Sequence, residues 1–169
     1  MDAEALKTIQ APLKQRYRED ADSAVVTMRA QGSLDSGQLS CKVETGRALV
    51  DAGLHPAAGG SGLQACSGDM LLEALVACAG VTVNAVATAL GLPLKGGEVR
   101  AEGDLDFRGT LAVDKEAPVG FREIRLHFDL ECEADEEQMA SLLKLTERFC
   151  VVYQTIRQGP EVRISLGRR

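Results

Sequence analysis

The chain has 169 residues, 45% hydrophobic and 26% charged, a composition typical of one soluble globular domain and incompatible with disorder throughout. Its 25 acidic and 19 basic residues give a formal net charge of −6, which argues against nucleic acid as a partner. The five cysteines are an odd set without a CxxC pair, so we expect reduced thiols and a cytoplasmic location rather than a secreted disulfide framework.

Residues 1–16 are predicted to form an amphipathic helix, because four apolar residues recur at helical spacing: Ala3, Leu6, Ile9 and Leu13. Pro12 is expected to distort this helix locally. The segment lacks the apolar core of a signal peptide, and no run in the chain reaches a bilayer-spanning length, so no membrane association is expected. Residues 24–30, 38–44 and 47–51 then predict three short strands divided by glycine-containing turns, which is a β-meander.

The most informative segment is residues 69–90, which predict a long helix after a glycine- and alanine-rich loop over residues 54–68. Ser67 is its predicted N-cap, and Gly91 is expected to end it. After its first position the helix carries one charged residue, Glu73. A helix apolar on nearly all sides must be enclosed on nearly all sides, and the strands of one chain could hardly cover it. The sheet of a partner chain would complete the cover.

Residues 99–107 and 124–132 both alternate strictly between apolar and polar side chains, which predicts an antiparallel pair of strands with one wet face. A capping-box pattern that begins at Asp135 predicts the start of a second helix, which is expected to end at Gly159. A last strand is predicted over residues 162–166. The predicted order is therefore three strands, a helix, two strands, a helix and a strand.

Two cysteines, Cys78 and Cys150, lie within the predicted helices. On local sequence alone, packing is the commoner role for such a residue, because a thiol becomes reactive only beside positive charge or at a helix N-terminus. His55 and Cys66, in the loop before the central helix, could be metal ligands or a Cys/His pair. No second CxxC or HxxxH motif completes such a site, so the sequence predicts no metal and no cofactor.

Three further residues have simpler interpretations. His127 lies on the polar face of its predicted strand and is expected to be solvated, whereas Cys132 shares the apolar face and is expected to pack. Cys41 lies on an early predicted strand, and the face it occupies is left open. The glycines of the loop over residues 54–68 follow no phosphate-binding pattern.

Two stretches resemble a known family. GDMLLEALVACAGVTV resembles the central-helix motif of the OsmC/Ohr family, and LTERFCVVYQTI resembles its second helix, which carries another cysteine. The resemblance covers residues 24–166, which leaves residues 1–22 as an N-terminal helical extension and residues 23–169 as an OsmC-like domain. It implies an α+β fold in which antiparallel sheets wrap around central helices in an intertwined homodimer.

The resemblance also implies roles for individual residues. Cys78 would be the peroxidatic thiolate and Cys150 the resolving thiol. The family supports its thiolate with an arginine from an early strand, for which Arg29 is preferred here over Arg47, and with a glutamate before the central helix. Asp69 is the candidate carboxylate, although the family position falls on Gly68.

Two departures from the family pattern bear on activity. Asp69 precedes Cys78 by nine residues, a rotation of about 900° that puts it on the opposite side of an ideal helix. Val151 stands where the family commonly has a proline after the second cysteine. Both departures suggest a branch away from the best-characterised peroxidases.

The function expected from this pattern is a thiol-dependent peroxidase that reduces organic hydroperoxides and is regenerated by a dithiol reductant. The alternative, favoured by the displaced carboxylate, is a non-catalytic OsmC-like protein that binds a small apolar or electrophilic molecule at the dimer interface. A third interpretation is an assembly protein with inert thiols.

Overall fold

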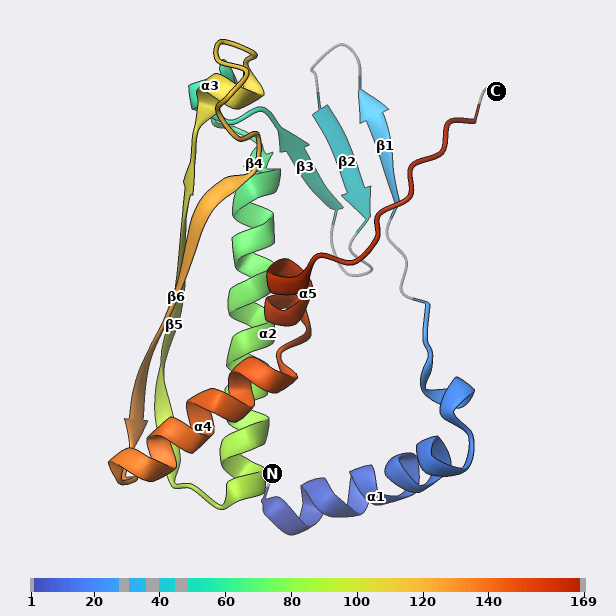
Figure 1. The fold of residues 1–169 in the computed structure, drawn as a ribbon, viewed down its shortest axis with the longest axis vertical. Coiled ribbons are helices and arrows are strands. Elements are labelled where there is room, and N and C mark those ends of the chain that lie inside the picture. The colour runs from blue at the N-terminus through green and yellow to red at the C-terminus, as the bar shows by residue number, and fades with distance from the viewer. Residues whose placement is uncertain (1, 28–30, 36–39, 45–48, 168–169) are drawn as a thin grey trace.

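The structure is a computed structural model that describes residues 2–27, 31–35, 40–44 and 49–167, with side chains described for residues 2–27 and 49–167. Helices and strands are mixed in the order of an α+β protein. Helix α2 runs through the middle, the strands β5 and β6 form a long ribbon on one side of it, and the helix α5 lies on the other (Figure 1).

The N-terminal helix α1 spans Ala3–Glu19 and is capped by Asp2, whose carboxylate accepts a hydrogen bond from the Ala5 N–H at 2.8 Å. The predicted helix is therefore confirmed and runs past Pro12, which lies inside it. None of its side chains is buried, although the helix contacts α2. It projects away from the rest of the fold at the end where α2 terminates (Figure 1).

The first predicted strand, residues 24–30, is wrong over its described part. A short 3₁₀ helix, η1 (Ala21–Ala24), occupies its start, and residues 25–27 have no regular structure. Asp20 caps this turn by accepting a hydrogen bond from the Asp22 N–H at 3.1 Å, a local bond that competes with strand formation. The last residues of the prediction, 28–30, lie outside the described residues.

A four-stranded sheet follows, in the order β1-β2-β3-β4. Its first three strands, β1 (Gln31–Asp35), β2 (Ser40–Glu44) and β3 (Leu49–Gly53), are antiparallel, which confirms the predicted meander although β1 lies where a turn was expected. After the 3₁₀ turn η2 (Pro56–Ala58), the two-residue strand β4 (Ala65–Cys66) pairs parallel to β3. This last pairing delivers the chain directly into the central helix.

Helix α2 spans Ser67–Leu90, so it begins earlier than predicted. Ser67 is inside the helix, and the N-cap is Cys66, whose side chain makes no capping hydrogen bond. At the other end the prediction holds, because Gly91 adopts the left-handed conformation, with φ of 67°, that closes a helix at little steric cost to glycine.

The expectation that no run in the chain reaches a bilayer-spanning length is wrong for α2. By length and composition the helix could cross a membrane, with a mean hydropathy of 1.9 over its best 18-residue window. The core helix of a soluble domain satisfies the same test, and α2 packs against β5, α4 and α5. Five of its 24 side chains are buried within the chain: Leu75, Ala79, Val83, Val86 and Ala87.

The predicted strand pair is confirmed and is longer than expected. Strands β5 (Leu94–Leu105) and β6 (Phe121–Cys132) are antiparallel and place alternate side chains against α2. His127 is exposed and Cys132 half-buried, as predicted. The connection contains the single-turn helix α3 (Phe107–Thr110), which replaces the predicted end of β5.

The C-terminal region differs from its prediction in two places. The capping box is confirmed, since Asp135 and Gln138 exchange hydrogen bonds of 2.8 and 3.0 Å, but the helix that it begins ends early. Two helices, α4 (Glu136–Phe149) and α5 (Val151–Gln158), replace the single predicted one. Residues 159–167 have no regular structure, so the predicted strand over residues 162–166 is wrong for the single chain. A strand needs a hydrogen-bonding neighbour, and the sheets of the described residues provide none for this segment.

The core consists of two clusters that lie along α2. One joins the second half of α2 to α4 through Val83, Val86 and Leu142. The other joins the middle of α2 to the start of α5 through Leu75, Ala79 and Cys150. The second cluster places a cysteine at the centre of the fold.

Candidate functional site

The structure brings Cys78 and Cys150 together. Cys78 lies in the middle of α2 and is half-buried, whereas Cys150, between α4 and α5, is 1% exposed. Both belong to the same apolar cluster, in which Val152 also packs. The two segments that carry the family resemblance therefore meet at their cysteines.

The break between α4 and α5 shapes this site. At Cys150 the backbone is extended, with φ of −73° and ψ of 107°, so α4 ends at Phe149 and a new helix starts at Val151. The first N–H groups of a helix have no partner within it and carry the positive end of the helix dipole. Cys150 is the N-cap of α5, but its side chain makes no capping hydrogen bond. The first turn of α5 therefore begins at the cysteine pair, and its Val152 packs in the same cluster.

Cys78 has a lowered pKa. Burial acts to raise it, but hydrogen bonds to the sulfur favour the thiolate and outweigh burial. The donors are the N–H of Val152, the thiol of Cys150, the hydroxyl of Thr82 and the N–H of Val151. The groups that lower this pKa are thus neutral hydrogen-bond donors, two of them from the first turn of α5.

The Thr82 hydroxyl is the weakest of these supports on chemical grounds. Its single proton has a second acceptor, the Cys78 carbonyl oxygen, at 2.7 Å. A hydroxyl that donates to the carbonyl of its own helix is not donating to the sulfur. The main-chain donors of α5 have no such alternative within their helix.

Cys150 has the opposite shift. Burial raises its pKa, and its hydrogen bond to Cys78 raises it further, because the Cys150 proton is the one that is donated. The N–H groups of Tyr153 and Val152 act in the other direction without reversing the shift. The pair therefore consists of a more acidic, half-buried thiol and a protonated, enclosed one.

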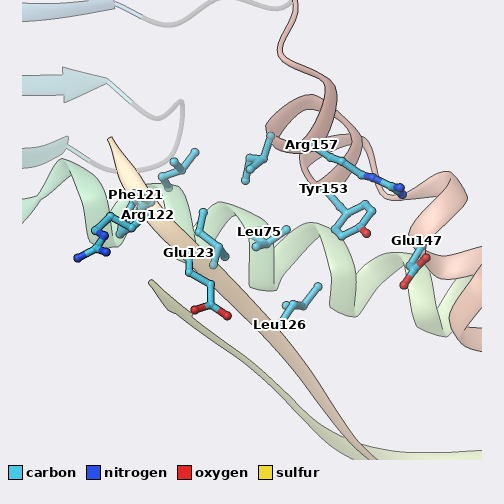
Figure 2. Close-up of a pocket in the computed structure, with 11 residues that line it drawn as sticks. Leu75, Phe121, Arg122, Glu123, Leu126, Glu147, Tyr153 and Arg157 are labelled. Carbon is cyan, nitrogen blue, oxygen red and sulfur yellow. The ribbon is translucent and has the colours of Figure 1, made fainter. Parts of the chain in front are cut away.

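A pocket lies beside this pair, on the face of α2 that Cys78 shares. Leu71, Leu75 and Cys78 are spaced four and three residues apart, which aligns them along one side of the helix. The first two line a pocket of about 730 Å³, open on one side, whose other lining residues come from β6, α4 and α5. Figure 2 shows Leu75, Leu126 and Tyr153 around it.

Charged side chains lie at the two ends of this pocket, Arg122 with Glu123 and Glu147 with Arg157, while its floor is apolar (Figure 2). Neither cysteine lines it. The pocket can accept the apolar part of a molecule whose polar end points toward the thiols, which lie one turn of α2 away.

A family model for OsmC-like proteins matches residues 60–165, which is more than half of the chain and includes both cysteines. The chain belongs to the OsmC-like protein family. No curated protein matches the sequence. The match does not extend to α1, so the predicted boundary between an extension over residues 1–22 and an OsmC-like domain stays a prediction.

Solved OsmC-like structures have the same fold. An OsmC-like protein from Mycoplasma pneumoniae is 18% identical, with a TM-score of 0.65 over 79% of this chain and 89% of its own. An organic hydroperoxide resistance protein OsmC from Legionella pneumophila is 18% identical, with a TM-score of 0.61 over 79% and 90%. One from Elizabethkingia anophelis is 17% identical, with a TM-score of 0.62 over 80% and 91%. At these identities the likeness establishes the fold, which confirms the predicted α+β OsmC-like class.

The remaining residues predicted from the OsmC-like pattern are not brought to the pair in the described part of the chain. Asp69 is exposed in the first turn of α2, about 13 Å from Cys78 along the helix axis. Gly68 is next to it, and a side chain at Gly68 would meet the Phe121 ring. Arg29 and Arg47 lie outside the described residues, so the choice between them stays a prediction.

His55 and Cys66 do not form a pair of ligands. The His55 Nδ1 accepts a hydrogen bond from the Ala57 N–H at 3.0 Å and so caps η2, and its ring stacks on Phe107 at 4.9 Å. Cys66 is the N-cap of α2. His55 therefore caps a short turn, and Cys66 lies at the start of the central helix without a capping bond from its side chain.

The feature that sequence reasoning missed is the helix break at Cys150. Periodicity joined α4 and α5 because their apolar stripes are nearly continuous. Neither a proline nor a Ser, Thr, Asp or Asn cap marks a new helix start at residues 150 and 151, so the sequence carried no signal of the break.

Proposed function

We propose that the protein is a thiol-dependent peroxidase that reduces organic hydroperoxides, with Cys78 as the attacking thiolate and Cys150 as the resolving thiol. The observation that carries the proposal is that the fold brings Cys78, which is half-buried, and Cys150, which is enclosed, into one apolar cluster. The lowered pKa of Cys78 and the raised pKa of Cys150 support it. A nucleophile must be a thiolate at neutral pH, and a thiol held beside it can later condense with its oxidised form.

The chemistry balances within this pair. The Cys78 thiolate attacks one peroxide oxygen, an S–O bond forms, the O–O bond breaks, and the alkoxide takes a proton to leave as an alcohol. Cys150 then attacks the sulfenic sulfur, an S–S bond forms, and its proton leaves with the hydroxyl group as water. The hydroperoxide is reduced by two electrons, and an external dithiol reductant returns the disulfide to two thiols.

The pocket supports an organic substrate over hydrogen peroxide. Its floor of Leu71, Leu75, Ile124 and Leu126 offers apolar surface one helical turn from Cys78, and burying an alkyl or aryl group there is favourable. Hydrogen peroxide has no apolar group to gain this energy. The proposed setting is a cytoplasmic homodimer, in keeping with the unpaired thiols of the four cysteines whose side chains the structure describes.

The test is stopped-flow kinetics with cumene hydroperoxide and hydrogen peroxide on the wild type and on Cys78→Ser. We expect faster consumption of cumene hydroperoxide by the wild type and no thiol-dependent consumption by Cys78→Ser. Cys132→Ser is the matched control, because Cys132 is also half-buried but lies at the end of β6. Equal rates for wild type and Cys78→Ser would eliminate the peroxidase.

The role of Cys150 has its own test. In Cys150→Ser the sulfenic acid on Cys78 loses its partner, so turnover should fall and sulfinic and sulfonic products should accumulate under excess peroxide. Mass spectrometry of the Cys78 peptide measures this directly. Unaltered turnover and unaltered over-oxidation in this variant would contradict the two-cysteine mechanism.

One observation favours a second candidate, a non-catalytic OsmC-like protein that binds a small apolar or electrophilic molecule. Asp69, the candidate for the carboxylate of the peroxidase pattern, lies about 13 Å along α2 from Cys78. Binding of a hydrophobic fluorescent probe that Leu71→Arg abolishes, at a pocket residue that is 40% exposed, in a protein that consumes no hydroperoxide, would support this function instead.

A further inference from the structure

The pocket and the cysteine cluster share a wall. Five described side chains line the pocket and also pack in the cluster that holds Cys78 and Cys150. Four of them are aliphatic and the fifth is a tyrosine: Leu75, Ile124, Leu126, Ile156 and Tyr153. Among the described residues, Tyr153 is therefore the one member of this shared wall with a polar side-chain atom, its phenol hydroxyl.

The hydroxyl of Tyr153 is available to a bound molecule. Tyr153 is half-buried in the first turn of α5, and its ring lines the pocket (Figure 2). Of the two tyrosines in the chain, only Tyr17 has a hydroxyl bound by another described side chain, the guanidinium of Arg16 at 3.5 Å. A tyrosine in an apolar wall usually hydrogen-bonds through its hydroxyl. A polar atom of a ligand in the pocket can be that partner.

The proposed reaction has a step that needs such a donor. When the Cys78 thiolate attacks the terminal oxygen of a hydroperoxide, the S–O bond forms, the O–O bond breaks, and its electron pair leaves on the alkoxide oxygen. An aliphatic alkoxide is strongly basic, so a proton delivered as the O–O bond breaks lowers the barrier. A phenol is a stronger acid than an aliphatic alcohol, so it can give this proton and recover one from water afterwards.

We propose that Tyr153 is the general acid of the pocket: its hydroxyl binds the leaving oxygen of the hydroperoxide and donates its proton to that oxygen. The proton transfer rests on the proposed function, whereas the hydrogen bond to an oxygen in the pocket does not. The four aliphatic side chains of the shared wall hold the organic group, and the polar end of the substrate meets the one polar atom that the described part of this wall offers.

The first experiment compares two oxidants that differ in their leaving group. Stopped-flow rates are measured with cumene hydroperoxide, which releases an alkoxide, and with peracetic acid, which releases a carboxylate that needs no proton. Tyr153→Phe removes the hydroxyl alone. It should lower the rate about a hundredfold with cumene hydroperoxide, as the loss of a general acid does, and less than about threefold with peracetic acid.

Tyr17→Phe is the matched control, because it removes the same hydroxyl from the N-terminal helix α1, and it should change neither rate. Equal losses with both oxidants in Tyr153→Phe would assign Tyr153 a packing role and overturn the proposal. An unchanged rate with cumene hydroperoxide would overturn it as well.

The second experiment needs no turnover. Cumyl alcohol carries the oxygen that the Tyr153 hydroxyl should bind, and cumene is the same molecule without that oxygen. The Kd of each is measured by NMR titration of the reduced full-length protein. Tyr153→Phe should weaken the binding of cumyl alcohol about fivefold, the usual effect of losing one hydrogen bond, and should leave cumene binding unchanged.

The two experiments separate this proposal from the proposed function. A wild type that consumes hydroperoxide, with a Tyr153→Phe variant that binds cumyl alcohol equally well, would overturn the role of Tyr153 and leave the peroxidase intact. A protein that shows the fivefold difference in cumyl alcohol binding and consumes no hydroperoxide would lose the peroxidase and the proton transfer, and would keep Tyr153 as the polar contact of the pocket.

Discussion

At the scale of single residues, the property that a thiol-based reaction can use is the difference in acidity between two neighbouring thiols. Cys78 and Cys150 lie in one apolar cluster, yet their pKa values move in opposite directions. Burial opposes ionisation of both, so the outcome depends on hydrogen-bond direction: Cys78 receives donors and Cys150 gives its proton. The first ionisation of the pair therefore belongs mainly to Cys78, with coupling between the two sites.

This difference predicts an order of modification. The thiolate is the form that reacts with iodoacetamide, so a lowered pKa brings alkylation of Cys78 to lower pH, and a raised pKa delays Cys150. As pH rises from 6 to 10, Cys78 should be labelled first and Cys150 last. Peptide mass spectrometry after timed quenching measures both, with Cys132 as the internal reference. Labelling of Cys150 before Cys78 would show that the assignment is reversed.

At the scale of helices and strands, the sequence predicted what local patterns determine. Strict alternation located β5 and β6, and the all-apolar run located α2, because each pattern reflects burial along one element. The capping box at Asp135 was found because its two hydrogen bonds join residues three apart. The wrong predictions share a different origin.

Those errors concern interactions that local patterns do not record. The break at Cys150 depends on packing against α2, since the flanking residues have the spacing of one continuous helix. Residues 162–166 alternate as a strand does, but a strand exists only beside another strand. The two cysteines of the candidate site came from family resemblance, whereas their opposite acidities needed the three-dimensional arrangement of donors.

The capping box at the start of α4 should make a measurable contribution to the free energy of unfolding. Asp135→Ala removes the side-chain acceptor for the Gln138 N–H and should lower the free energy of unfolding by about 1 kcal/mol. Urea denaturation at fixed protein concentration measures it. Glu137→Ala is the matched control, since that exposed residue lies in the same turn and outside the cap. An equal effect from both variants would mean that the cap contributes nothing specific.

At the scale of the whole molecule, one chain covers little of its central helix. Five of the 24 side chains of α2 are buried, and apolar residues on its other faces are open, among them Val81 at 73% exposed. The exposed apolar residues of α5 and the C-terminal segment add to this surface: Val151, Val162, Ile164 and Leu166. Surfaces of this kind on a soluble protein mark association.

We therefore expect an obligate dimer. Covering the open faces of α2 with the sheet of a second copy makes folding and association inseparable, so the thermal midpoint should rise with protein concentration. Sedimentation velocity at low micromolar concentration should show a species of twice the chain mass. A folded monomer at that concentration, with a midpoint independent of concentration, would contradict this expectation.

The exposed apolar faces of α2 also have a consequence while the chain is being synthesised. The helix is complete at Leu90, whereas β5, β6, α4 and α5, which cover it within one chain, lie between Leu94 and Gln158. A ribosome that has released residues 67–90 thus presents a long apolar helix before the elements that bury most of its covered face are made. Early translation intermediates should recruit holding chaperones that bind extended apolar segments. Refolding from denaturant should follow second-order kinetics, so its rate should fall as the protein concentration is lowered.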